Sequence, residues 1–331
     1  MFDKAALMWI YAEHPVHAGS GTGVGAIDLP IQRENITNWP IIQPSGLKGA
    51  LREYFDDDDR KSKLTPPDKD YEEKIKEAFG PDVSADHAGA IALTEGKLLL
   101  FPVCSLKGTF AYVTCPLAIK RLRRDLAAMK EQVKIDFLSA SAPNISALPD
   151  ITTTPDENTI WVAALPQQSA NLPLKPDSIL IIDNKVILNE LSFTVQANKI
   201  VNDLAAWLGC RAPGLSWLEN KNNISKRLII VNDDTFRFFV EMYTEVITRN
   251  KIDDDTGVVA NGALWVEEYL PRESVLYSTV FAVKPFKKTP ILASGQKVLD
   301  FITGTYCPKY LWVGGNTTTG KGLVKLQFIK K

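Results

Sequence analysis

The segment from His14 to Glu34 gathers side chains that could perform acid–base or metal chemistry beside a phosphate. It reads HPVHAGSGTGVGAIDLPIQRE and contains two of the three histidines of the chain, several glycines and Asp28. Glycine lets a phosphate approach the backbone, because no Cβ stands in the way. Asp28 could hold a metal ion or orient an attacking hydroxyl, and His17 could transfer a proton near neutral pH. A loop with an ordinary surface aspartate is the alternative, and the pattern alone leaves both open.

A second candidate site, for a phosphate, lies in the segment from Pro40 to Arg52, PIIQPSGLKGALR. We expect a helix here that Ser45 caps, with Lys48 and Arg52 beyond it on the same side. The backbone N–H groups of a helix amino terminus and two nearby cations suit an RNA phosphate. The alternative is a helix that packs closely on a sheet through its glycines, with both cations merely solvated.

A third candidate is the segment GGNTTTGKG, from Gly314 to Gly322. Gly315 to Lys321 satisfies the first seven positions of a P-loop, G-x-x-x-x-G-K. The next residue is Gly322 instead of Ser or Thr, and the alternating LVKLQFI that follows predicts a strand, so no helix dipole would face a triphosphate. We therefore expect no nucleotide cofactor, and we expect Gly320, Lys321 and Gly322 to contact an RNA backbone.

A fourth candidate pairs Glu267 with Tyr269 in the segment WVEEYLP. Residues i and i+2 of a strand point to the same face, so both side chains could reach one site. An edge strand with solvated acids is the alternative.

Composition limits the class of protein. The 331 residues are 45% hydrophobic and carry a net charge of −1, from 38 basic and 39 acidic residues, so RNA binding would need a local basic face. Four scattered cysteines without a C-x-x-C pair predict neither a zinc ribbon nor a disulfide framework. We expect no signal peptide, membrane span or membrane partner, and hence a cytoplasmic protein.

The secondary structure expected around these residues predicts an α+β fold. Strands are expected at 5–13, 97–105 and 110–114, a basic amphipathic helix at 117–133, a hairpin at 179–195 that turns at Asp183-Asn184, and a second hairpin into ALWVEEYLP. Asp233 is a candidate cap for a short helix. The basic helix is expected to be solvated or to face another subunit. Since strands and helices do not alternate regularly, the pattern favours a mixed sheet.

Together these segments resemble the RAMP superfamily of CRISPR proteins, and most closely the fourth, or backbone, subunits of the type III-B (Cmr) complexes. The resemblance spans nearly the whole chain and rests on His17–Gly21, Gly25–Glu34, Leu47–Arg52, Gly262–Pro271 and Gly314–Gly322. One departure is Pro44-Ser45-Gly46, where the family usually has Gly-Ser-Ser or Gly-Ser-Thr before Leu-Lys-Gly. Proline removes one backbone donor there.

The resemblance implies one RRM-like (ferredoxin-like) domain over 1–331 with large insertions: a catalytic loop at about 14–44, a charged loop and helix at 56–89, an irregular insertion at 134–177, and a β-hairpin thumb with its turn at 249–262. Such subunits stack in a filament on a CRISPR guide RNA, with other Cmr subunits, and cut single-stranded target RNA at regular intervals. Asp28 would then be the catalytic and metal-binding residue, with His17, Glu267 and Tyr269 shaping the site. Ser45, Lys48, Arg52, Gly320, Lys321 and Gly322 would bind RNA.

On this basis we expect a prokaryotic, cytoplasmic endoribonuclease that uses Mg²⁺ or Mn²⁺ and is weak or inactive outside the complex. Three rival interpretations stay open. The chain could be a non-catalytic scaffold of the same complex, a guide-processing endonuclease that needs no metal, or a nucleotide-dependent enzyme that uses the carboxyl-terminal glycine segment.

Overall fold

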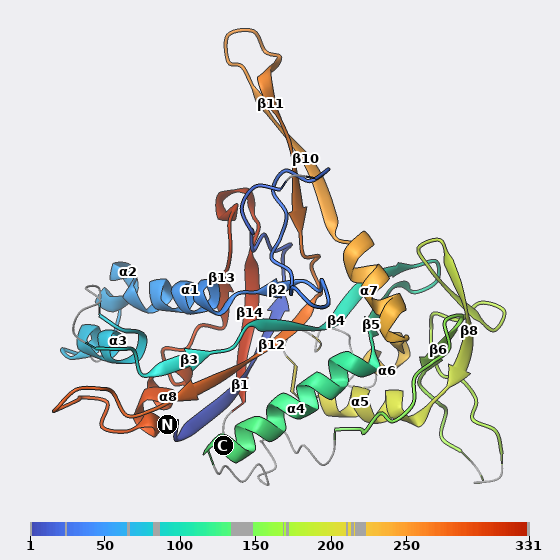
Figure 1. Cartoon of the computed structure of the whole chain (residues 1–331), viewed down its shortest axis with the longest axis horizontal. Coiled ribbons are helices and arrows are strands. Elements are labelled where there is room, and N and C mark those ends of the chain that lie inside the picture. Colours follow the sequence, from blue (N-terminus) through green and yellow to red (C-terminus); the bar gives the residue numbers. More distant parts are fainter. Residues whose placement is uncertain are drawn as a thin grey trace.

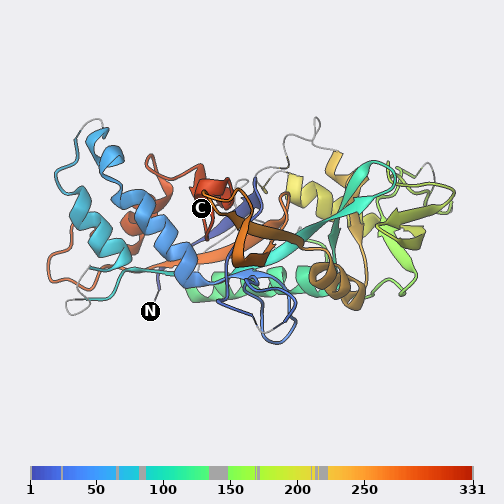
Figure 2. The ribbon, with the colours of Figure 1, turned by 90° about the horizontal axis from the view of Figure 1, so that it is seen from above.

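The protein is an elongated body from which a two-stranded ribbon projects (Figure 1). This computed structural model describes residues 2–23, 25–64, 67–81, 87–133, 148–167, 169, 172–209, 211–212, 215 and 223–329. Seen from above, the ribbon rises near the middle of the long axis, with α1 to α3 toward one end and β6 to β8 toward the other (Figure 2).

Twelve strands of the described chain form one sheet, in the order β13, β14, β1, β12, β4, β5, β9, β6, β8, β7, with β2 paired to β4 and β3 to β12. Their bounds are β1 Lys4–Ala12, β2 Ile41–Ile42, β3 Ile91–Leu93, β4 Gly96–Ser105, β5 Thr109–Thr114, β6 Thr159–Val162, β7 Lys185–Leu188, β8 Leu191–Ala197, β9 Leu228–Ile230, β12 Val275–Ala282, β13 Tyr310–Trp312 and β14 Leu323–Ile329. The mixture of this sheet with helices confirms the α+β class.

The helices are α1 Pro44–Asp56, α2 Asp58–Ser62, α3 Tyr71–Phe79, α4 Pro116–Val133, α5 Lys199–Gly209, α6 Asn223–Arg227, α7 Asp233–Met242 and α8 Gly295–Thr303. Strand β1 lies between β12 and β14, antiparallel to both. Its central position explains why it is a continuous apolar run instead of an alternating one. On one of its faces Trp9 contacts Trp207 of α5 and Tyr277 of β12, with ring centroids 6.0 and 6.4 Å apart.

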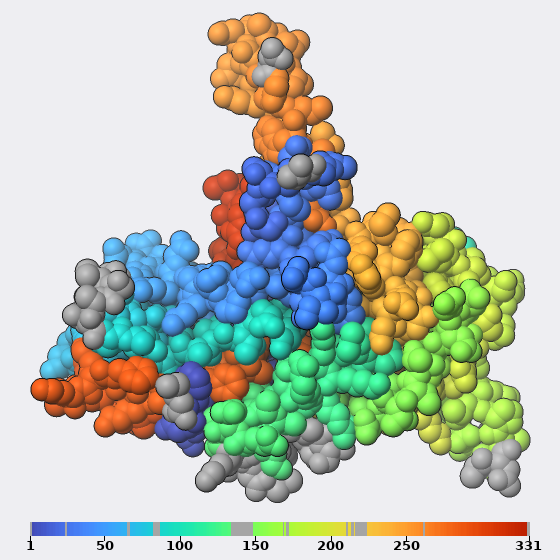
Figure 3. All heavy atoms as spheres, viewed as in Figure 1, coloured from blue at the N-terminus to red at the C-terminus, as the bar shows by residue number. Residues whose placement is uncertain are grey.

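The projecting ribbon consists of β10 (Glu245–Ile252) and β11 (Val259–Tyr269). The two strands pair antiparallel from Glu245 opposite Tyr269 to Ile252 opposite Val259. Its outer half carries exposed apolar side chains, including Ile252, Val258 and Leu264, the last 64% exposed. Figure 3 shows this part standing clear of the body, so pairing between its own strands holds it together.

Several local predictions differ from the structure. Ser45 does not cap α1, because the helix begins at Pro44 and its cap residue Gln43 makes no side-chain bond to the helix. Proline suits this first position, where its missing N–H would have no partner within the helix. Helix α7 is capped by Asn232, not by Asp233, and the Asn232 side chain accepts from the Thr235 N–H at 2.7 Å.

Three loop predictions need amendment. A turn does occur at Asp183-Asn184, but the chain reverses again after Leu188, since β7 pairs with β8. The charged segment after Asp56 includes the short helix α2. Of the segment 134–177, residues 134–147 lie outside the described residues, and the part expected to be irregular contains β6, which pairs in parallel with β8.

Candidate active site

The loop that carries His17 and Asp28 is held in place by backbone hydrogen bonds to distant segments. Val16 and Leu270 exchange two bonds of 2.9 Å at the foot of the ribbon. The Gly315 N–H donates to the carbonyl of His17 at 2.9 Å. A Cβ on Gly314, which has φ +82°, would lie 2.2 Å from that same carbonyl oxygen, so the close crossing of the two loops requires glycine.

Asp28 lies at the base of the ribbon. Its Oδ2 accepts from the Val266 N–H at 2.7 Å, and the N–H groups of Asp28 and Leu29 both donate to the carbonyl of Val266. The loop thus adds a short parallel pairing, Leu29 with Glu267, to the edge of β11. The carboxylate is exposed, and Oδ1 accepts no hydrogen bond from any of the described residues. Asp28 is therefore fixed at one oxygen and accessible at the other.

His17, Glu267 and Tyr269 form a buried cluster next to this edge. The His17 and Tyr269 ring centroids are 5.5 Å apart, and the Tyr269 hydroxyl donates to Oε2 of Glu267. Glu267 also accepts from Trp265 Nε1 at 2.8 Å and from Asn316 Nδ2 at 3.0 Å. The prediction that Glu267 and Tyr269 share a strand face is confirmed, and the alternative of solvated acids is wrong, because Glu267 is only 3% exposed.

The histidine tautomer follows from the bond that its ring makes. His17 Nδ1 lies 2.8 Å from the carbonyl oxygen of Glu268. A carbonyl only accepts, so Nδ1 carries the proton, and in the neutral ring Nε2 keeps its lone pair. Nε2 lies over Gly19, where an added Cβ would be 2.8 Å away. In the neutral ring, His17 thus keeps an unprotonated nitrogen that is packed against a glycine of the Asp28 loop.

The surroundings of Glu267 shift two pKa values. Burial alone would raise the pKa of Glu267, but the bonds from Tyr269 and Trp265, with the nearby charge of Arg249, lower it below 4.5. Burial and the Glu267 carboxylate raise the pKa of Tyr269 to about 12. Glu267 is therefore an ionised acceptor at neutral pH, and Tyr269 remains a neutral donor to it.

Glu268 supports the site from the opposite face of β11. Its carboxylate is 2% exposed and accepts from Arg33 at 2.6 Å, from the Thr244 hydroxyl at 2.7 Å and from the Ile31 N–H at 3.0 Å. It therefore joins the Asp28 loop to β11 and to Thr244, the residue before β10. Sequence reasoning does not single out Glu268, because a carboxylate next to Glu267 carries no signal beyond the alternation of strand faces.

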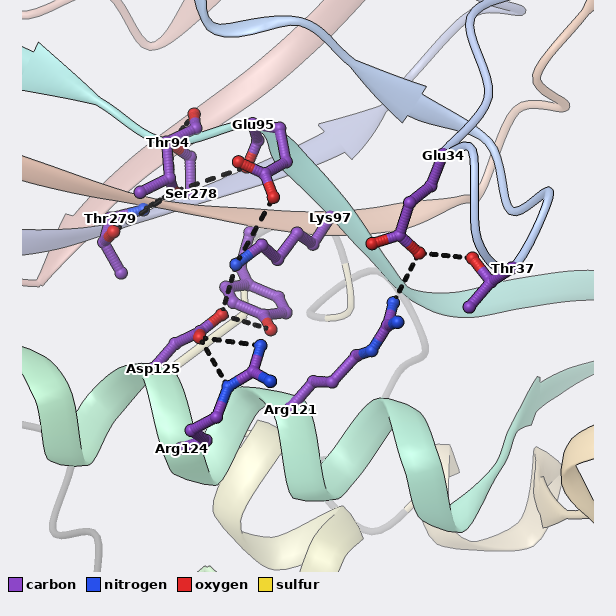
Figure 4. Close-up of polar contacts among 11 residues, drawn as sticks. Glu34, Thr37, Thr94, Glu95, Lys97, Arg121, Arg124, Asp125, Ser278 and Thr279 are labelled. Carbon is purple, nitrogen blue, oxygen red and sulfur yellow. Dashed lines mark hydrogen bonds and ion pairs between the residues drawn. The ribbon is translucent and has the colours of Figure 1, made fainter.

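The far part of the same loop is held by α4 (Figure 4). Arg121 donates to Glu34 at 2.6 Å, and its guanidinium lies 5.1 Å from the ring centroid of Trp39. Thr37 donates to the same Glu34 carboxylate. Burial alone would raise the pKa of Glu34, but the bonds from Thr37 and Arg121 lower it below 4.5. Arg121 is thus an anchor for the loop, not the solvated or subunit-facing cation that the basic helix suggested.

The predicted RNA contacts on α1 divide into two groups. Ser45, Gly46 and Gly49 are exposed, and a Cβ added at either glycine would meet no described atom within 4 Å. The alternative of a helix packed closely on the sheet through these glycines is therefore wrong. Lys48 is half-buried and donates to the Ile91 carbonyl at 3.1 Å, and burial together with the charge of Arg52 lowers its pKa. Arg52 is partly buried one turn further along.

The carboxyl-terminal glycine loop, residues 314–322, joins β13 to β14 and contacts the buried cluster. Lys321 Nζ lies 4.7 Å from the ring centroid of Tyr269. Gly320 is exposed with φ +76°, whereas the Gly322 N–H donates to the Pro15 carbonyl at 2.8 Å. The segment after this loop is the strand β14, as predicted. The fold thus brings Asp28, His17, Glu267, Tyr269 and Lys321 to the foot of the ribbon.

The side chains that could bind a metal ion at this site limit the kind of metal binding that is expected. No group of three or more His, Cys, Asp or Glu side chains in the described part of the chain could enclose a metal ion. Among the described residues of this site, Asp28 has an exposed carboxylate, whereas Glu267 and Glu268 are buried. Mg²⁺ keeps several waters and is commonly held by one or two carboxylates together with substrate phosphates. The residues therefore fit a cation shared with RNA and do not fit a resident, protein-enclosed metal.

The fold is that of a known class. The model of the RAMP superfamily matches residues 9–325, and the chain belongs to that superfamily. Among curated proteins it is 36% identical to the CRISPR system Cmr endoribonuclease Cmr4 of Pyrococcus furiosus, with 98% of this chain and 95% of the relative covered.

Solved structures agree. The oligomeric Cmr4 of Pyrococcus furiosus superposes with a TM-score of 0.66 at 28% identity, over 99% of this chain and 98% of that one. A chain of the type III-B Cmr-beta complex bound to cognate target RNA gives a TM-score of 0.70 at 22% identity, over 99% and 98%, which shows the shared fold. None of the helices in the described ranges has both the length and the apolar content to cross a membrane.

Proposed function

We propose that this chain is a repeating backbone subunit of a type III-B CRISPR effector complex in the prokaryotic cytoplasm, where it binds guide RNA and cleaves target RNA. The observation that carries the proposal is the position of Asp28. Its exposed carboxylate is held at the foot of the projecting ribbon by hydrogen bonds to Val266 of β11. The relative that is 36% identical is itself named an endoribonuclease.

The finer architecture belongs to the same proposal. The sheet around β1, with α1 and α4, would be an RRM-like palm, and β10 with β11 would be the thumb. A ribbon with exposed apolar side chains is suited to wedge between stacked bases and splay the target strand. Copies of the chain would stack along the guide with other Cmr subunits, so that cuts recur at the spacing of the subunits.

The chemistry needs little from the protein, because RNA carries its own nucleophile, the 2′-hydroxyl. A strand splayed at the foot of the ribbon would meet the free oxygen of Asp28, which orients that hydroxyl for in-line attack. His17 would accept or return a proton through Nε2. Lys321 would stabilise charge on the phosphate. Glu267 and Tyr269, both buried, would position His17 and the glycine loop without contacting RNA.

A divalent cation, Mg²⁺ or Mn²⁺, is part of the proposal. It would lie between Asp28 and the RNA phosphates, and it would neutralise charge on the reacting phosphate. A guide-processing endonuclease would instead cut precursor RNA in EDTA. A nucleotide-dependent enzyme would bind ATP, which calorimetry measures.

The test is cleavage of target RNA by the assembled complex with Asp28→Asn. We expect cleavage to fall by about a hundredfold or more while guide binding stays unchanged. Asp59→Asn, an exposed carboxylate of α2, is the control and should cleave normally. Normal cleavage by Asp28→Asn would contradict a catalytic role for Asp28 and favour the interpretation of the chain as a non-catalytic scaffold. Loss of guide binding would show that Asp28 has a structural role.

A further inference from the structure

A groove on the body next to the candidate active site has no role in the function proposed above. Its volume is about 900 Å³, and it lies between α1, the start of α2, β13 and the glycine loop 314–322. The side chains that line it include Tyr54, Arg60, Lys309, Tyr310 and Trp312. Figure 1 shows β13 beside the carboxyl-terminal strand β14 and next to α1.

Two aromatic rings of β13 face outward along this groove. Tyr310 is 47% exposed and Trp312 is 46% exposed, whereas Leu311 between them is buried at 3%. β13 is the terminal strand of the sheet, so both rings stand on its edge. The Trp312 ring packs edge-on against His14 at 6.4 Å, and His14 donates to the Gly320 carbonyl at 2.9 Å. Trp312 is thus held in place by the glycine loop itself.

Cations accompany these rings. Lys325 Nζ lies 5.9 Å from the Tyr310 ring centroid, and Arg60 lies 3.8 Å from that of Tyr54. Glu53 and Asp57 also line the groove. Asp57 is already occupied as the cap of α2, accepting from the Arg60 N–H at 2.8 Å. Partly exposed aromatic rings with cations around them are an arrangement by which proteins bind single-stranded nucleic acid without reading its sequence.

We propose that this groove binds bases of single-stranded RNA, stacked on Trp312 and Tyr310, while the adjoining glycine loop and Lys321 hold the phosphates. The inference rests on the proposed function and adds a second, non-ionic contact to it. The groove adjoins the proposed RNA-binding glycine loop, because Trp312 lies two residues before Gly314, where that loop begins. The exposed glycine face of α1 continues into Ala50, Glu53 and Tyr54 on the opposite wall.

The groove favours RNA over a protein segment. A docked peptide needs pockets for apolar side chains, but of the aliphatic residues that line the groove Leu311 is buried and Leu323 is only partly exposed. The remaining lining is mainly aromatic rings, long cations and polar side chains such as Thr317 and Thr318, and the rings and cations match bases and phosphates. A second copy of the chain is the alternative occupant of the groove, and the experiment must distinguish it from RNA.

The experiment measures binding of the full-length chain to single-stranded RNA that carries a fluorescent aminopurine base at one position at a time. We expect binding by Trp312→Ala and by Tyr310→Ala to be roughly tenfold weaker, with loss of aminopurine quenching, because stacking on one ring is removed. Trp312→Phe should retain most of the affinity. Phe286→Ala, which removes a 54% exposed ring outside the groove, is the matched control and should bind as the wild type does.

Salt dependence separates stacking from phosphate contact. The slope of log affinity against log salt should stay unchanged in Trp312→Ala and fall by about one in Lys321→Ala. If the wild type binds RNA and the Trp312→Ala and Tyr310→Ala variants bind it equally tightly, the groove does not bind RNA, while the proposed function stands. No RNA binding by the wild type, alone or assembled, would overturn both. Loss of self-association in Trp312→Ala without RNA, measured by sedimentation, would assign the groove to a second copy instead.

Discussion

At the scale of single residues, the geometry distinguishes glycines that the fold requires from glycines that leave room for a ligand. Gly19 and Gly314 are of the first kind, since a Cβ at either would overlap His17. Gly46 and Gly49 are of the second kind, because a Cβ there would meet nothing in the described chain. The sequence shows the same letter at all four positions. Substitution should therefore have opposite consequences in the two groups.

Gly19→Ala tests whether the ring of His17 matters for cleavage. The new Cβ would lie 2.8 Å from Nε2, so the ring must move away from its present place. We expect cleavage by the assembled complex to fall at least about tenfold, with guide binding unchanged, because a proton-transfer group has lost its position. Gly25→Ala, in the same loop with nothing within 4 Å, is the control and should cleave normally. Equal activity of the two variants would remove His17 from the mechanism.

The pKa of Glu34 gives a second prediction at this scale. Its pKa in the folded protein lies below the ordinary value of 4.5, so the unfolded chain binds more protons once the pH falls below that value. The ion pair with Arg121 therefore stabilises the fold above about pH 4.5, and this contribution is lost as the pH falls through the lowered pKa. Glu34→Gln should unfold at lower urea concentration at neutral pH, and the gap from wild type should close on acidification.

The control for this measurement is Glu131→Gln, which removes the same charge from an exposed position of α4. Its urea midpoint should follow that of the wild type across the whole pH range. A gap for Glu34→Gln that persists unchanged to about pH 3 would mean that the loop is not held by the ionised carboxylate.

At the scale of elements, α1 combines poor helix propensity with an exposed face. Glycine within a helix costs roughly 1 kcal/mol relative to alanine, and neither Gly46 nor Gly49 is needed for packing inside the chain. This cost is understandable if the RNA backbone approaches the helix where the two glycines lie.

We therefore expect Gly46→Ala and Gly49→Ala each to raise the free energy of unfolding by about 0.5–1 kcal/mol and to weaken guide RNA binding. Urea denaturation measures the first effect and filter binding the second. A variant that is more stable and binds RNA as tightly as the wild type would show that this face of α1 does not contact the guide.

At the scale of the whole molecule, the ribbon projects from the body of the protein (Figure 1). Contacts between β10 and β11 dominate its outer half, while its foot is bonded to the Asp28 loop through Val266 and Glu268. The position of the ribbon and the position of Asp28 are therefore mechanically linked. If the ribbon inserts into a duplex of guide and target RNA, as proposed above, the displaced target strand would lie next to the Asp28 carboxylate.

Shortening the ribbon tests this arrangement. Replacing residues 251–263 by Asn-Gly would close a two-residue turn between Asn250 and Leu264, which are paired in the present register. We expect the free energy of unfolding to change by less than about 1 kcal/mol, because most of the described side chains that it removes are exposed. Guide binding should persist and target cleavage should fall sharply, as read from RNA cut by the assembled complex. Full cleavage by the shortened protein would exclude a wedging role for the ribbon.

Several features of the fold were readable along the chain because they depend on local pattern. The apolar run of β1, the amphipathic helix α4 and the alternating β14 have the periodicities of their structures, and each lies within one or two residues of its predicted range. Helix starts were less accurate. Ser45 and Asp233 are both residues that cap helices well, but backbone geometry placed the caps earlier, at Gln43 for α1, two positions before Ser45, and at Asn232 for α7, one position before Asp233.

Residue type and short-range spacing were enough to predict the α+β class, the cluster of chemically capable residues at His17 and Asp28, and the glycine loops. The bonds by which Glu268 and Arg121 hold the Asp28 loop, and the groove that Trp312 and Tyr310 line beside the glycine loop, emerge only when the chain is folded. Such contacts join residues up to hundreds of positions apart. They depend on strand order and loop path, which local propensity does not encode.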